Sequence, residues 1–187
     1  MPPVTVRRAT AADCPAIADV YAHYVTTSVA TFDTEARSTD GWIAKLDDVR
    51  RAGRPFLVAV DGERVLGFSY LSAFRDRAAY AHTCEHTVYV APGLERRGVG
   101  SALVAAMLDA AADTDVREIL ALIALPGDGS IALHQRHGFV EAGVLRRVGF
   151  KFDRWIDVAI LQYSLGRVAP ALFNQMVDKQ TSPWNGY

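Results

Sequence analysis

The sequence is poor in cysteine. Only Cys14 and Cys84 occur among its 187 residues, too few for a disulfide framework. The metal-binding spacings C-x-x-C and H-E-x-x-H are absent, so we expect no metal site. A lone cysteine in a strand-like run, such as Cys84, is more typical of a small core residue than of a nucleophile.

Long apolar runs and an excess of one charge are also missing. No uncharged apolar stretch approaches the roughly 18 residues that a membrane span needs, and the start, MPPVTVRR, lacks the apolar segment of a signal peptide. The formal net charge is -1, which gives no global attraction to nucleic acid. We therefore expect a soluble cytoplasmic protein without a nucleic-acid or membrane partner, in which any anion recognition is local.

Strand and helix signals alternate along the chain. A strand is expected at 4–8, a helix after the capping-box pattern Thr10-x-x-Asp13, and a second helix after Ser38 or Thr39. Asp61-Gly62 between two apolar runs predicts a hairpin of 56–60 with 64–71. Further strands are expected at 83–90, in the run REILALIAL, and at 140–145 and 155–162, with a helix that Asp128 can cap. The pattern predicts one α/β domain over residues 1–165 with a mixed sheet, and a tail of unknown role over 166–187.

A glycine pair stands at the start of an apolar helical pattern, in LERRGVGSALVAAML. A P-loop would need a lysine after Gly100, and a dinucleotide-binding loop would need a third glycine where Leu103 stands, so both motifs fail. Gly98 and Gly100 at a helix N-terminus still suit a phosphate, with Arg96 and Arg97 adding positive charge. The alternative is a helix start with packing glycines and two solvated arginines.

Several blocks in order resemble the GNAT superfamily of acetyl-coenzyme A dependent N-acetyltransferases, and the phosphinothricin acetyltransferase family in particular. They are RDRAAYAHTCEHTVYVAPGLERRGVGSAL, LIALPGDGSIALHQRHGFVEAG and VGFKFDRWIDVAILQ, preceded by FDTEAR. The resemblance covers about residues 4–165. It departs from the family at Glu95, where Gln or Arg is usual, and at Gly127, where asparagine is usual.

This resemblance implies a GNAT fold, in which about four helices flank a mixed, mostly antiparallel sheet of six to seven strands, with a splay near the fourth strand. It implies acetyl-CoA as co-substrate. A strand beside the splay can bind the pantetheine arm through its backbone and place one N–H at the thioester oxygen. The residues expected to bind the coenzyme are Val88, Tyr89, Val90, Arg96, Arg97, Gly98, Val99, Gly100, Ser101 and, through its backbone, Gly127.

Two side chains are candidates for proton transfer. Glu85 alternates onto the same strand face as Thr87 and Tyr89, and a carboxylate there can accept the proton of the substrate ammonium. Family members with glutamate at this position use it as the general base. His134 falls where many relatives carry a tyrosine, and it could protonate the departing thiolate or orient a substrate anion; a structural histidine is the alternative. His86 points to the opposite strand face and is interpreted as structural.

The expected acceptor is the amine of a small amino-acid-like compound such as phosphinothricin, methionine sulfoximine or methionine sulfone, attacking directly in a ternary complex. The residues expected around it are Arg75, Arg77 and Tyr80, a second basic and aromatic wall of Lys151 and Trp155, and Phe32 closing over the site. Two alternatives remain open, a peptide N-terminal acetyltransferase and a non-catalytic acyl-CoA binding module. Relatives of this type are commonly homodimers, so a homodimer is expected.

Overall fold

A seven-stranded mixed sheet runs through residues 4–166, the part of the chain that the computed structural model describes. The expected tail, apart from Gly166, lies outside the described residues. None of the helices between residues 4 and 166 is long and apolar enough to cross a membrane. In chain order, the elements are β1 (Thr5–Arg8), η1 (Ala11–Asp13), α1 (Cys14–Thr27), α2 (Thr39–Arg51), β2 (Phe56–Asp61), β3 (Arg64–Ala73), η2 (Ala78–Tyr80), β4 (Thr83–Val90), α3 (Val99–Ala112), β5 (Glu118–Ala124), α4 (Asp128–Arg136), β6 (Val140–Lys151) and β7 (Arg154–Ser164).

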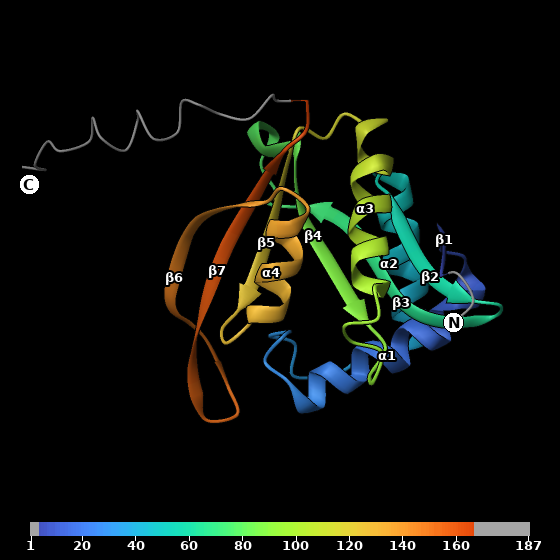
Figure 1. Ribbon diagram of the computed structural model, residues 1–187, viewed down its shortest axis with the longest axis horizontal. Coiled ribbons are helices and arrows are strands. Elements are labelled where there is room, and N and C mark those ends of the chain that lie inside the picture. Colours follow the sequence, from blue (N-terminus) through green and yellow to red (C-terminus); the bar gives the residue numbers. More distant parts are fainter. Residues whose placement is uncertain (1–3, 167–187) are drawn as a thin grey trace, which may run out of the picture.

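The strands lie in the order β1-β2-β3-β4-β5-β7-β6. Every neighbouring pair is antiparallel except β4 and β5, which are parallel and are joined through α3. A parallel pair needs such a crossover because its second strand must start again from the same end of the sheet. The predicted mixed sheet is confirmed, with seven strands and four α-helices (Figure 1).

Local sequence signals account for most element boundaries. The N–H of Thr10 donates to the Asp13 carboxylate at 2.7 Å, and Ser38 caps α2 by accepting from the N–H of Gly41 at 3.1 Å. Gly62 in the β2–β3 turn has φ +59°, as the Asp-Gly pair predicted. One boundary prediction was wrong: Asp128 does not cap α4 but is its first residue, because Gly127 occupies the N-cap.

The sheet has an apolar core on each face. One core packs α3 against Leu57, Leu71 and Ile119, with α4 at its margin. The other packs α1 and α2 against the opposite face, with Trp42 and Phe68 fully buried. Successive side chains of a strand point to opposite faces, so β4 contributes Cys84 to the first core and the partly buried Tyr89 to the second.

β4 and β5 pair over three residues only, Thr83–Glu85 with Glu118–Leu120. Beyond that point they diverge toward their C-terminal ends (Figure 1). On the β3 side, Thr83 O accepts a hydrogen bond from the N–H of Phe74, and the N–H of Ala91 donates to Leu66 O. Backbone groups alternate between the two sides of a strand, so the odd-numbered residues of β4 direct theirs toward β3. The alternate residues His86, Val88 and Val90 therefore turn their N–H and C=O groups toward the gap.

Candidate functional site

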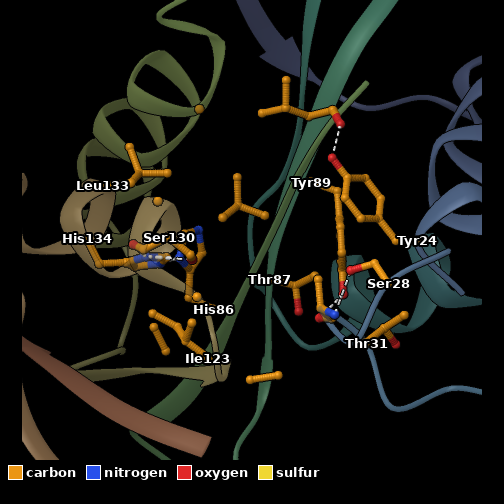
Figure 2. Close-up of a pocket in the computed structure, with 18 of the residues that line it drawn as sticks. Tyr24, Ser28, Thr31, His86, Thr87, Tyr89, Ile123, Ser130, Leu133 and His134 are labelled. Carbon is orange, nitrogen blue, oxygen red and sulfur yellow. Dashed lines mark hydrogen bonds between the residues drawn. The ribbon is translucent and has the colours of Figure 1, made fainter. Parts of the chain in front are cut away.

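A cleft of about 1010 Å³ follows the gap between β4 and β5 and is lined by residues from both faces of the sheet. Such a volume lies at the upper end of what ligand sites in proteins enclose. One wall comes from α4 and the opposite wall from α1 and the loop after it, on the left and right of Figure 2. Most of the residues predicted to bind a coenzyme line it, namely Val88, Tyr89, Val90, Arg96, Gly98, Gly100, Ser101 and Gly127.

The N-terminus of α3 forms one end of the cleft. Ala102 is bonded to Gly98 O at 2.9 Å, as the first i to i−4 bond of the helix, which leaves the N–H groups of Val99, Gly100 and Ser101 directed out of its end. Gly98 has φ +84°, a conformation that glycine adopts without strain. A Cβ on Gly100 would lie 3.1 Å from the Leu133 side chain, so a larger residue would narrow this end of the cleft. Free N–H groups and a positive helix end suit an anion such as a phosphate.

Two residues of the predicted phosphate motif, Val99 and Arg97, are not among the residues that line the cleft. The side chain of Val99 is 1% exposed and belongs to the α3 core, so only its backbone faces the cleft end. Arg97 is exposed and is not among the lining residues, whereas Arg96 is. Val99 can therefore contribute to anion binding only through its backbone. Arg97 precedes α3 and is exposed to solvent, and its contact with a phosphate stays a prediction.

Gly127 is required by the tight turn between β5 and α4. A Cβ there would lie 2.5 Å from Ile123 Cγ2 and 2.6 Å from the carbonyl oxygen of Ala124. Its carbonyl accepts from the N–H groups of Ser130 and Ile131 at 3.0 Å each. Gly127 thus allows α4 to start close beside β5, and its backbone borders the cleft.

Glu85 lies on β4 at the point where the pairing with β5 ends, and it lines the cleft. Burial raises the pKa of its carboxyl group, and the charges of Lys45 and Arg75 partly offset that shift. A carboxylate with a raised pKa is a stronger base than an exposed one. The predicted role of Glu85 as a base is compatible with its position at the cleft and with the direction of its pKa shift.

His134 lines the cleft from α4, and His86 reaches it from β4 (Figure 2). Their Nε2 and Nδ1 atoms lie 3.0 Å apart. His86 does point away from the Glu85 face, as predicted, but it reaches the cleft because the strands separate beside it. Within residues 4–166, no three His, Cys, Asp or Glu side chains gather as a metal-binding group.

The predicted acceptor residues Arg75, Arg77 and Tyr80 lie on the exposed connection between β3 and β4. The guanidinium carbon of Arg75 is 5.2 Å from the centroid of the Phe74 ring, and Tyr80 meets the same ring edge-on at 5.5 Å. None of the three is among the lining residues of the cleft. Arg75 is nevertheless close enough to Glu85 for its charge to act on that pKa.

Lys151 does not form the predicted basic wall. It is 6% exposed, and its Nζ donates to the carbonyl oxygens of Ser28 and Thr31 at 2.9 Å each. Burial lowers the pKa of its amine. The prediction is corrected because the ammonium of Lys151 is engaged in two hydrogen bonds to carbonyl oxygens of the loop after α1.

Phe32 lines the cleft, as predicted residues of the acceptor site should, and it packs against β6, the strand that carries Lys151. A Cβ on Gly149 would lie 2.3 Å from the Phe32 ring, so the ring rests directly on the backbone of β6. Lys151 and Gly149 together fix the loop that carries Phe32. The contact of Phe32 with the acceptor stays a prediction.

Trp155 also lies away from the cleft. It is 54% exposed on β7, meets Phe150 edge-on at 5.3 Å, and carries the Arg147 guanidinium over its ring. Trp155 is not among the residues that line the cleft, and its substrate contact stays a prediction.

Sequence reasoning did not select Lys45, which lies on α2 with its Nζ 5.0 Å from the centroid of the Tyr70 ring. Tyr70 lines the cleft. Burial and the nearby charge of Arg37 lower the pKa of Lys45, and its own charge acts on Glu85. Its helix position resembled any solvated lysine, so the sequence carried no signal that could have singled it out.

Comparison with known proteins gives a consistent result. The model of the acetyltransferase (GNAT) family matches residues 17–139. The phosphinothricin N-acetyltransferase of Alcaligenes faecalis is 39% identical over 162 residues, covering 86% of this chain and 82% of the relative. A phosphinothricin acetyltransferase from Sinorhizobium meliloti, solved with acetyl-CoA, has a TM-score of 0.84 and 34% identity over 87% of this chain and 89% of its own. A ribosomal-protein-alanine N-acetyltransferase from Brucella melitensis also has a TM-score of 0.84 and 34% identity, covering 86% of this chain and 99% of its own.

The contribution of the two Lys151 hydrogen bonds can be tested by replacing Lys151 with methionine. Lys151→Met leaves two loop carbonyls without their donor, so we expect the free energy of unfolding to fall by about 1–3 kcal/mol. The amides of Ala30 and Asp33 should exchange faster with deuterium. Arg154→Met is the matched control, because Arg154 is paired with Lys151 in the hairpin but is exposed. Unchanged stability and exchange in Lys151→Met would contradict the assigned role.

Proposed function

The chain belongs to the acetyltransferase (GNAT) family, and we propose that it transfers the acetyl group of acetyl-CoA to the amine of a small amino-acid-like compound by direct attack in a ternary complex. The observation that carries this proposal is the cleft at the split between β4 and β5, which has a helix N-terminus at one end and Glu85 at the other. Phosphinothricin, methionine sulfoximine and methionine sulfone are the acceptors we propose first.

The α3 end of the cleft would hold the coenzyme. Its free N–H groups and the charge of Arg96 suit the pyrophosphate, and the narrow passage beside Gly100 suits an extended chain. Val88 turns both of its backbone groups into the gap, which suits the amide groups of a pantetheine arm. Donors of this kind also stabilise the negative charge that develops on a thioester oxygen during attack.

Glu85 would act as the general base. The acceptor arrives as an ammonium ion and must lose a proton before its nitrogen can attack the thioester carbonyl. A buried carboxylate with a raised pKa can take that proton directly or through one water. A module that only bound acyl-CoA would have no use for such a base, which argues against the non-catalytic alternative.

The acceptor end favours a compound that carries an anion beside its amine. The charges of Lys45 and Arg75 both act on Glu85, from α2 and from the loop after β3. Within residues 4–166, the ammonium of Lys45 has neither a hydrogen bond nor an ion pair, and it lies against the Tyr70 ring that lines the cleft. A free cation beside the base suits a carboxylate or phosphinate of the acceptor.

The peptide N-terminus remains the second candidate acceptor. The similarity to the Brucella melitensis enzyme, whose name refers to a ribosomal protein, favours it. Phe32 and the loop that Lys151 holds border the acceptor end of the cleft and suit a small molecule better.

Glu85→Gln tests the base. We expect kcat to fall by about 10²- to 10⁴-fold, because the amide cannot accept the proton. In the unchanged protein kcat/KM should fall as the pH drops through the pKa of Glu85, which lies above its usual value, and the variant should lose this acidic limb. Glu63→Gln, on the exposed β2–β3 turn, is the control. Full activity in Glu85→Gln would rule out the assignment.

An acetylation screen tests the acceptor class. Release of free coenzyme A from acetyl-CoA is measured with phosphinothricin, methionine sulfoximine, methionine sulfone, the common amino acids and short peptides. We expect the highest kcat/KM with small amino acids that carry a second polar or anionic group. Lys45→Met should raise the KM for the anionic acceptors by about tenfold, the effect of one charge-assisted contact of roughly 1.4 kcal/mol. Activity with peptides alone would overturn the proposed class.

We also propose a homodimer that forms through the β6–β7 hairpin. β6 is an edge strand, and edge strands are usually covered or protected in native proteins. The hairpin exposes an unusual share of apolar surface for a monomer. Its exposed large apolar residues are Val140, Val144, Leu145, Val148, Phe150, Phe152 and Trp155.

Sedimentation of the full chain tests this interface. We expect a dimer, and Phe150→Asp should shift it toward the monomer because a carboxylate would be buried without a partner. Arg64→Asp, at the exposed start of β3, introduces the same residue type at a distant site and should leave the dimer intact. A monomer at all concentrations would refute the proposal.

A further inference from the structure

A line of hydrogen bonds connects β3, β4 and α4 behind the wall of the cleft. Ser69 Oγ lies 2.7 Å from His86 Nε2, His86 Nδ1 lies 3.0 Å from His134 Nε2, and His134 Nδ1 lies 2.8 Å from the carbonyl oxygen of Ser130. The exposed fractions of Ser69, His86 and His134 are 0%, 6% and 2%. Figure 2 shows the two rings and Ser130 together on the α4 side of the cleft.

The carbonyl oxygen at the α4 end of this line determines which atom donates in each of its hydrogen bonds. A carbonyl oxygen only accepts, so His134 Nδ1 carries a hydrogen and donates it to Ser130. Burial lowers the pKa of both histidines, that of His86 strongly, so each ring is neutral near pH 7 and has one N–H only. His134 Nε2 is then an acceptor and takes its hydrogen from His86 Nδ1. His86 Nε2 accepts in turn from the Ser69 hydroxyl.

All four ring nitrogens are thereby engaged inside the protein. Neither ring turns an N–H or a free lone pair toward the cleft, so neutral His134 has no proton to give to a thiolate. Phe139 holds the rings from the side, edge-on to His134 at 4.9 Å and stacked on His86 at 6.2 Å. His137 is the other ionisable group whose charge acts on both rings, and its Nε2 is bonded to Ser101 Oγ at 2.8 Å.

We propose that His86 is a positioning residue, which fixes the ring orientation of His134 so that His134 forms a rigid, neutral wall of the cleft and is not the proton donor of the reaction. This inference rests on the proposed function and changes the role that the sequence predicted for His134.

The proton that the departing sulfur needs can come from the substrate nitrogen, so the reaction requires no acid from the protein. The ammonium gives one proton to Glu85, and the free amine forms a C–N bond with the thioester carbonyl carbon. The resulting intermediate carries a positively charged nitrogen next to the sulfur. When the C–S bond breaks, the sulfur keeps the electron pair and takes the second proton of that nitrogen, directly or through water. The products are the acetylated amine and free coenzyme A.

Nitrogen-15 spectra of the full chain labelled in histidine test the hydrogen-bond directions without turnover. We expect His134 at pH 7 to show a protonated Nδ1 and an unprotonated Nε2. Signals from a protonated Nε2, or from a doubly protonated ring, would overturn the inference whether or not the protein acetylates any compound.

Variants of the two histidines then test the role. His86→Asn keeps an N–H close to the place of Nδ1, and His86→Phe keeps a ring against Phe139 but has no donor. We expect kcat to change little in His86→Asn and to fall about tenfold in His86→Phe, as for one lost buried hydrogen-bond partner. In His134→Asn we expect kcat to fall about tenfold and the shape of the pH profile to stay as in the unchanged protein. If the unchanged protein loses activity at alkaline pH, and His134→Asn removes that pH dependence and lowers kcat by 10² or more, His134 is the acid.

If none of the screened compounds is acetylated, the proposed function fails. The nitrogen-15 spectra still decide the hydrogen-bond directions in that case. If acetylation is found and His86→Phe is as active as the unchanged protein, the positioning role alone fails. Circular dichroism and thermal unfolding of each variant show whether a loss comes from misfolding.

Discussion

The short pairing between β4 and β5 is the constraint on which the rest of the site depends. A strand that loses its neighbour leaves backbone N–H and C=O groups without partners, and such groups are costly to bury unless something else bonds them. Here Tyr24 donates its hydroxyl to Val90 O at 2.7 Å and satisfies one of them. The groups of Val88 remain available at the cleft. The same separation lets side chains from both faces of the sheet, Glu85 from one and His86 from the other, reach one ligand site.

The far end of the chain shapes the acceptor side of the site. Lys151 and Gly149 lie more than a hundred residues after the loop that they contact, yet they fix that loop through two hydrogen bonds and one close ring contact. A buried ammonium is stable only when its donors find acceptors, so the two carbonyls and the lysine depend on one another. The β6–β7 hairpin therefore serves the site with its inner residues, while its outer residues form the apolar surface proposed for the dimer.

Burial has opposite consequences for the ionisable groups on the two faces of β4. It raises the pKa of Glu85 and so makes a carboxylate into a stronger base. It lowers the pKa of His86 and His134 and so keeps both rings neutral. Both shifts have one cause, the cost of holding a charge in a medium that solvates it poorly. One face of the strand can therefore take up a proton, and the other gives a rigid polar wall.

The sequence alone determined the features that depend on neighbouring residues. The sequence predicted the capped starts of the first helices, the Asp-Gly hairpin, the alternation along β4 and the glycine pair at the start of α3. These features are predictable because turn chemistry and side-chain periodicity act over a few residues. The motif blocks indicated the family, and Glu85, Phe32 and most of the residues proposed to bind the coenzyme lie at the cleft. Only the tertiary structure decided what Lys151, Trp155, Lys45 and the two histidines contact. Their roles depend on whether a charge is buried and on which distant atom completes its hydrogen bonds, and neither property is encoded in the local pattern of the chain.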